Sequence, residues 1–308
     1  MAPLHQPARD PGKNAIVALS SLRARGHPAK WLAGNRAYSN QKPEHFQLPA
    51  RAFGYRPVFD YKVDQLGVQE EYRGMLQIEG AWCCPAIPKT LIDATADFRA
   101  GRIDDTTYAA RLEERSNYAI VAKSGHDEEG HRRVRCPASV PHPTVRCSLK
   151  PASVPLPVRG RLRIAVPEDL AAHPPTICVQ QSVTLPPDAG AKLAQDLRFG
   201  SPEYRERYGT LRNSIEGFNG YIKDGANEAL DDPERRRIRG VAAQTVFVAF
   251  LLFAANLRKI RSTQEQLAEK SGSLRRLSRR RKTKALGDWL PEVPNLAPGS
   301  DPDPPRTA

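Results

Sequence analysis

The order of helix-like and strand-like segments predicts an α/β fold whose small core is interrupted by a long, mixed insertion. A helical spacing of apolar residues over 14–25 is followed by a short apolar run, 31–34, that is typical of a strand. Two long helical patterns come late in the chain, at about 202–223 and 232–261, and Gly240 is a candidate break in the second. Because 65–200 between them is irregular, we expect an incomplete sheet, an insertion and C-terminal helices.

Each element of this order has its own local signal. Ile16, Leu19 and Leu22 share one helical face, and Gly26 with Pro28 ends that helix. Strand-like runs are expected at 31–34, 55–61, 77–82, 161–166 and 176–183, helices at 88–118 with an interruption near Gly101, and a polar turn at 124–131. The expected organisation is a partial core at 1–64, the insertion at 65–200, core helices at 201–262 and a basic, disordered tail at 263–308.

The composition points to an anionic partner in a reducing compartment. The 308 residues carry a formal net charge of +13, which favours polyanions such as DNA, RNA or anionic lipid. Five cysteines are an odd number, and residues 1–13 have no apolar run of the signal-peptide type. We therefore expect a cytoplasmic protein that binds nucleic acid, with no small-molecule substrate.

One nearly apolar stretch, 241–257 (VAAQTVFVAFLLFAANL), has two interpretations. A membrane span needs about 20 apolar residues, and this run is shorter and contains Gln244, Thr245 and Asn256. A buried core helix is therefore the favoured interpretation, and membrane association through this run is the alternative.

The helix expected at 202–223 has two faces. Tyr204, Tyr208, Leu211, Ile215, Phe218 and Ile222 follow a 4-3-4-3-4 spacing and predict a buried stripe. Arg212, Glu216, Asn219 and Lys223 lie on an adjacent face. Taken alone, this second face is typical of a solvated helix with an Arg–Glu pair.

The string YGTLRNSIEGFNGYIKD, followed by RRRIRGVAAQTVFVAFLLFAANLRKI, resembles the closing helices of DDE-type insertion-sequence transposases, which have an RNase H-like core. The motif residues are Tyr208, Arg212, Glu216, Asn219 and Lys223. The resemblance implies that Glu216 is the third catalytic carboxylate and holds Mg²⁺, which in this family activates water and the DNA 3′-hydroxyl. It also implies that the other four residues contact DNA.

The acidic partners of Glu216 are missing from the sequence. The string Gly34-Asn35-Arg36-Ala37-Tyr38 resembles the G-D-x-A-Y segment that carries the second aspartate, so Asn35 occupies a degenerate Asp position. Asp10 lies in a Pro/Gly-rich stretch, so we do not assign it as the first aspartate. We expect a truncated or degenerate transposase that is catalytically impaired and can form homo-oligomers. The alternative for Asn35 is an ordinary turn residue at a strand end.

The cysteines allow a second metal. A four-thiolate Zn²⁺ site from Cys84, Cys136, Cys147 and Cys178 is chemically reasonable, with Cys83 as a replacement for Cys84. No CxxC pair supports it, so free cysteines are the alternative. The polar cluster at 126–131 is interpreted as a solvated loop rather than a metal site.

A basic run follows the last helix. It includes Arg275, Arg276, Arg279, Arg280 and Arg281. Such a run binds phosphates without reading sequence, and the alternative is a solubilising tail. Three classes of protein therefore stay open: a transposase-family protein, a non-enzymatic basic nucleic-acid-binding protein, and a membrane-associated protein.

Overall fold

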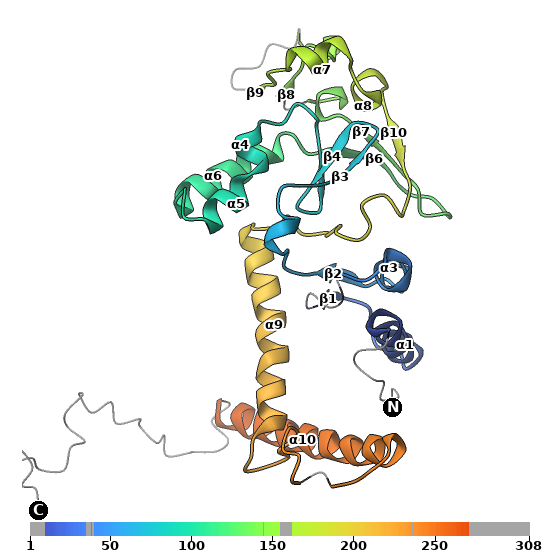
Figure 1. Ribbon diagram of the computed structural model, residues 1–308, viewed down its shortest axis with the longest axis vertical. Helices are drawn as coiled ribbons and strands as arrows, with labels where there is room; N and C mark the ends of the chain where they lie inside the picture. The colour runs from blue at the N-terminus through green and yellow to red at the C-terminus, as the bar shows by residue number, and fades with distance from the viewer. Residues whose placement is uncertain are drawn as a thin grey trace, which may run out of the picture. The chain divides into compact units, whose positions relative to one another are not determined.

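The computed structural model describes residues 10–34, 38, 40–143, 145–154, 162–235 and 237–270 (Figure 1). The chain divides into two compact units, 1–252 and 253–308. Helices and several small sheets make up the first unit, so the α/β class is confirmed. Sheets of two or three strands are all that the described residues contain, so an RNase H-like core stays a prediction.

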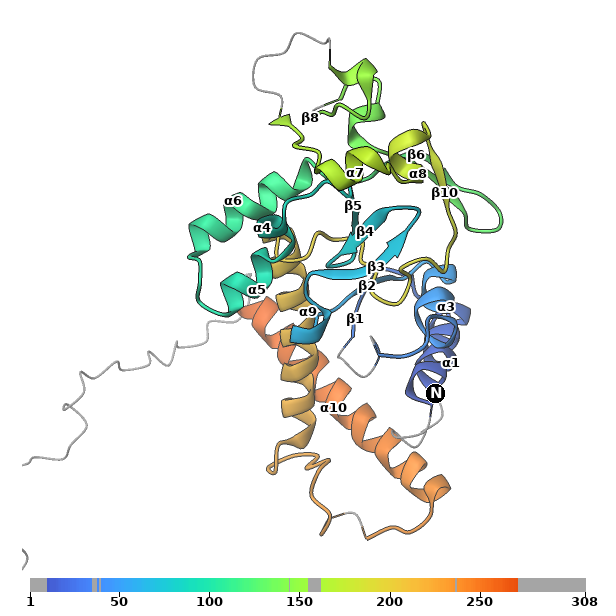
Figure 2. The same cartoon turned by 45° about the horizontal axis from the view of Figure 1, so that its top comes forward.

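The N-terminal part pairs two parallel strands. Helix α1 (Pro11–Ala24) leads to β1 (Trp31–Ala33), and η1 (Pro43–His45) and α3 (Gln47–Ala52) lead to β2 (Arg56–Val58). Strand β1 pairs with β2 in parallel, so their carboxyl ends meet at one edge. Figures 1 and 2 place α1 and α3 side by side, where they share a small apolar core. The helix expected at 14–25 and the strand expected at 31–34 are confirmed.

The end of α1 follows from its glycine. Gly26 has a φ of 80°, the left-handed conformation that glycine adopts without a steric penalty. The amides of Gly26 and His27 donate to the carbonyls of Arg23 and Leu22, the pattern of a Schellman cap. The helix therefore ends where the sequence predicted.

An antiparallel meander begins the insertion. It comprises β3 (Val68–Tyr72), β4 (Met75–Ile78) and β5 (Ala81–Cys83), after the short η2 (Val63–Gln65). The single strand expected at 77–82 is wrong. Glu79 and Gly80 both have positive φ and form a two-residue turn that splits the run into β4 and β5.

Three short helices follow the meander. They are α4 (Lys89–Ile92), α5 (Ala94–Arg99) and α6 (Asp105–Ser116), so the helical region expected at 88–118, with a break near Gly101, is confirmed. Asp104 caps α6 because its carboxylate accepts from the Thr107 amide at 2.8 Å.

The rest of the insertion is built from short pieces around the main apolar cluster. These are β6 (Val121–His126), β7 (Arg132–Arg135), η3 (Pro137–Ser139), β8 (Val145–Arg146), η4 (Pro151–Ser153), β9 (Leu162–Arg163), α7 (Glu168–Ala172), α8 (Thr176–Val179) and β10 (Val183–Leu185). The polar turn at 124–131 is the tip of the β6–β7 hairpin. The strand expected at 176–183 is wrong over most of its length, because its first residues form α8 beyond Pro175.

Helix α9 (Pro202–Lys223) has the bounds that the sequence predicted. Ser201 caps it by accepting from the Tyr204 amide at 3.1 Å, and Pro202 occupies the first turn. The expected buried stripe is only partly confirmed. Tyr204 and Ile222 are buried at the two ends, whereas Ile215 between them is 49% exposed.

Helix α10 (Val241–Lys270) starts directly after Gly240, whose φ is 91°, at the break that the sequence suggested. It continues to Lys270, so the expectation of a disordered tail from residue 263 is wrong for residues 263–270. The prediction of a buried core helix is wrong for the described residues. Only 6% of its apolar 18-residue window is buried, and Phe250 and Phe253 are 68% and 61% exposed. By length and composition α10 is the one described helix that is able to cross a membrane.

Candidate functional site

A cavity of about 910 Å³ lies between α9 and the N-terminal part of the chain. Its walls come from α1, the end of β1, the segment after β2, and one face of α9. The lining includes Ala15, Leu19, Gly34, Tyr38, Asp60, Tyr208, Arg212, Glu216 and Asn219. The first unit therefore has a hollow that faces the helix carrying Glu216.

Four of the five motif residues line this cavity. The ring of Tyr208 stacks on Tyr204, with their centroids 5.5 Å apart. Nε of Arg212 lies 2.8 Å from Oε1 of Glu216, and both side chains are more than half exposed. Lys223 lies outside the lining, and its ammonium is 3.9 Å from Asp231. The Arg212, Glu216 and Lys223 side chains are all more than half exposed, but Lys223 lies near Asp231 instead of at the cavity.

The degenerate position Asn35 lies outside the described residues, as do Arg275, Arg276, Arg279, Arg280 and Arg281. The residue before it, Gly34, donates its amide to the Val58 carbonyl and lines the cavity. The carboxyl end of β1 therefore opens into the same hollow as Glu216.

Asp60 is a cavity residue that sequence reasoning missed. It lies two residues beyond β2, whose carboxyl end is beside that of β1 because the strands are parallel. An Oδ atom accepts from Arg99 at 2.6 Å. An acidic residue near the end of the strand-like run 55–61 was the signal that could have found it, but only the pairing of β1 with β2 brings it toward Glu216.

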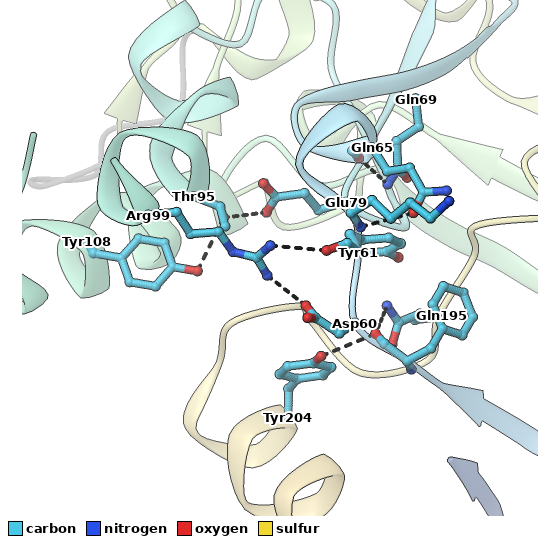
Figure 3. A network of polar contacts seen from close by, with 12 residues as sticks. Asp60, Tyr61, Gln65, Gln69, Glu79, Thr95, Arg99, Tyr108, Gln195 and Tyr204 are labelled. Atoms are coloured by element: carbon cyan, nitrogen blue, oxygen red, sulfur yellow. Dashed lines mark hydrogen bonds and ion pairs between the residues drawn. The ribbon is translucent and has the colours of Figure 1, made fainter. Parts of the chain in front are cut away.

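A polar network fixes the segment that carries Asp60 (Figure 3). Gln195 donates to the Phe59 carbonyl at 2.9 Å and accepts from the Phe59 amide at 3.1 Å. The Tyr204 hydroxyl donates to the same carbonyl, and burial raises the pKa of this phenol so that it stays protonated. Arg99 also donates to the Tyr61 carbonyl at 3.0 Å. The first turn of α9 is thereby tied to the end of β2.

The donors in the cavity suit one hard cation better than two. Glu216 and Asp60 are the carboxylates among the described lining residues, and Asn219 adds an amide oxygen. Oxygen donors of this kind suit Mg²⁺. Arg212 already occupies one oxygen of Glu216, and two divalent ions would need more negative charge than two carboxylates supply.

The cysteines form a second place of interest, in the main apolar cluster. All five are free and buried. The thiol of Cys84 donates to Cys136, which lowers the pKa of Cys136 to about 7, whereas burial raises that of Cys178 to about 11. Burial also raises the pKa of Cys83 to about 12, and the charges that act on Cys83 come from Arg115, Glu79 and Arg198 rather than from cysteines. Cys84 and not Cys83 therefore belongs with the other thiols.

Asp127, Glu129 and His131, at the tip of the β6–β7 hairpin, form one group that could hold a metal ion. Their ligand atoms lie within 4.8 Å of one another, although the sequence had favoured a solvated loop. Asp127 is 54% exposed in its side chain, and Nδ1 of His131 lies 3.6 Å from it. An exposed acidic cluster of this kind is common without a metal.

Comparison of the chain with protein-family models, with curated proteins and with solved structures finds no match. Its function is therefore inferred from the residues and their geometry.

Proposed function

We propose that the chain is a DDE-type transposase-family protein with an RNase H-like core that binds DNA and is catalytically impaired. One observation carries this proposal: the motif residues Arg212, Glu216 and Asn219 face the cavity into which the carboxyl end of β1 opens. A third carboxylate on a helix, opposite the ends of parallel strands, is the arrangement that the resemblance implies.

DNA is the partner that the charge supports. The formal net charge of +13 favours a polyanion, and the Arg212 side chain is 54% exposed beside the cavity. A phosphodiester at the mouth of the cavity would accept from this guanidinium. Mg²⁺, when bound, would screen the charge of that phosphate and would be held by Glu216 and Asp60.

The impairment follows from charge. In an intact two-metal site, three carboxylates balance two divalent cations. Here Asn35 supplies no negative charge at its position, and Arg212 neutralises much of Glu216. One Mg²⁺ can bridge the chain and a phosphate, but the second ion needed for in-line strand transfer lacks ligands.

The test is DNA binding with and without Mg²⁺, measured by fluorescence anisotropy on a labelled duplex with the full chain. We expect Mg²⁺ to tighten binding, and Glu216→Gln to remove that gain. Glu206→Gln is the matched control, because Glu206 lies on the same helix, is exposed and does not line the cavity. Binding that ignores both Mg²⁺ and Glu216→Gln would instead indicate a non-enzymatic basic nucleic-acid-binding protein.

The impairment has its own assay. Strand-transfer reactions with Mg²⁺ or Mn²⁺ should yield no joined product. Product formation that depends on Glu216 would refute the impaired site while supporting the family.

A second candidate, membrane association, is favoured by α10. Its apolar window has a mean hydropathy of 1.6, and only 6% of that window is buried. Carbonate washing of membranes from expressing cells separates the two: a DNA-binding protein of the cytoplasm is released, whereas a chain anchored by α10 stays with the lipid.

A further inference from the structure

Three of the buried cysteines begin turns of the same form. In each turn the amide three residues further on donates to the carbonyl of the cysteine. The bonds are Ile87 to Cys84 at 3.1 Å, Ser139 to Cys136 at 2.9 Å, and Lys150 to Cys147 at 3.0 Å. These three cysteines therefore share one local backbone conformation.

In these turns the backbone also affects the ionisation of the cysteine thiol. The backbone amides of Ala86, Ala138 and Leu149, each two residues beyond its cysteine, act to lower the pKa of the respective thiol. An N–H that donates to sulfur stabilises the thiolate over the thiol. Such a backbone suits a turn that presents a thiolate to a metal.

The thiols of these turns converge with a fourth, Cys178 of α8. Cys84 donates to Cys136, and the charge of Cys136 acts on both Cys147 and Cys178. All four are at most 5% exposed and belong to one apolar cluster, although they come from segments far apart in the chain. The fold therefore brings four thiols into one buried cluster.

A buried cation accompanies the thiols. Lys150 is 9% exposed, and its ammonium donates to the Gln180 carbonyl at 2.7 Å. Its charge acts on Cys136, Cys147 and Cys178. No carboxylate among the described residues forms an ion pair with Lys150. A buried ammonium is costly without a compensating charge, which an anionic set of thiolates would supply.

We propose that Cys84, Cys136, Cys147 and Cys178 bind one structural Zn²⁺ ion. Each thiol releases its proton on binding, so the site becomes a zinc tetrathiolate with a net charge of −2, partly offset by Lys150. Among the described residues, no three of these sulfurs form a group as tight as that of Asp127, Glu129 and His131, so binding draws them together. No oxidation or reduction is involved.

Zinc bound at this site would hold the short segments of the insertion together. The insertion consists of strands of two to six residues and of helices that are mostly shorter than two turns. Such pieces bury little apolar surface, and a metal bound by four distant segments fixes their arrangement. This proposal is independent of the transposase proposal, because none of its residues lines the Glu216 cavity.

The experiment is metal analysis of the full chain purified under reducing conditions without chelator. We expect about one equivalent of zinc, and less than about a tenth of an equivalent would overturn the site. Cys147→Ser and Cys178→Ser should lose the metal. Cys83→Ser is the matched control and should retain it, because Cys83 is buried but lies outside the thiol set.

Two measurements on the unaltered chain keep the test valid if the variants fail to fold. Titration with a mercurial should release zinc in step with four thiols, and replacement with Co²⁺ should give the intense visible absorption of tetrahedral thiolate-bound cobalt. Iron in place of zinc, or a Cys84–Cys136 disulfide in peptide mapping, would overturn the zinc assignment.

Discussion

The guanidinium of Arg212 lies 2.8 Å from the carboxylate of Glu216, one turn further along α9. This pair has two consequences for the cavity that it lines. It presents a cation to an approaching phosphate, and it competes with any metal ion for Glu216. Because both side chains are more than half exposed, the pair stabilises the fold little, and its effects belong to binding.

We predict that Arg212→Gln moves two affinities in opposite directions. The affinity for Mg²⁺ rises severalfold because Glu216 is released, and the affinity for DNA falls because one phosphate is no longer neutralised. Isothermal titration with Mg²⁺ and anisotropy with DNA measure the two effects. Arg207→Gln, which removes the same charge from an exposed position of α9 outside the cavity lining, should leave Mg²⁺ affinity unchanged.

Restoring charge next to Gly34 should strengthen metal binding. Asn35→Asp adds a carboxylate where the resemblance places the second aspartate, so we expect about a tenfold gain in Mg²⁺ affinity, or about 1.4 kcal/mol. Asn40→Asp, an exposed change outside the cavity lining, is the control. An equal gain in both variants would mean that only net charge matters.

Removing the basic run should weaken DNA binding and its dependence on salt. A chain ending at Lys270 lacks Arg275, Arg276, Arg279, Arg280 and Arg281. The slope of log K against log salt should fall by about 0.9 for each phosphate that the shortened chain no longer neutralises. An unchanged slope would identify the run as a solubilising tail.

A buried ion pair stabilises the junction between β4 and α6. Nη1 of Arg115 lies 2.5 Å from Oε2 of Glu79, and both side chains are at most 6% exposed. Glu79→Gln leaves the guanidinium without a countercharge and should cost about 3–5 kcal/mol in denaturant unfolding. Arg102→Gln, which breaks an exposed pair with Asp97, should leave the midpoint almost unchanged.

The exposure of α10 gives a stability prediction. Phe253→Ser should change the free energy of unfolding by no more than about 0.5 kcal/mol, because the side chain is 61% exposed. Leu112→Ala, at a buried position of α6, should cost about 2–5 kcal/mol. A destabilisation at Phe253 as large as that at Leu112 would restore the interpretation of α10 as a core helix.

The sequence by itself determined the elements whose signals are local. The bounds of α9 follow from Ser201 and Pro202 at its start, and the end of α1 follows from Gly26, because capping depends on neighbouring residues. The run at 241–257 was recognised as helical from its own local signal, a long series of apolar residues. Whether that helix is covered depends on partners that periodicity does not encode, so its burial was misjudged.

Only the tertiary structure decided which residues from distant parts of the chain come together. Asp60 reaches the Glu216 cavity only because β1 and β2 pair in parallel, and only the fold places Cys84 rather than Cys83 beside Cys136. Two adjacent cysteines look equivalent in sequence and are both buried in the same apolar cluster, yet only Cys84 interacts with Cys136. Local chemistry thus marked the candidate residues, and strand pairing selected among them.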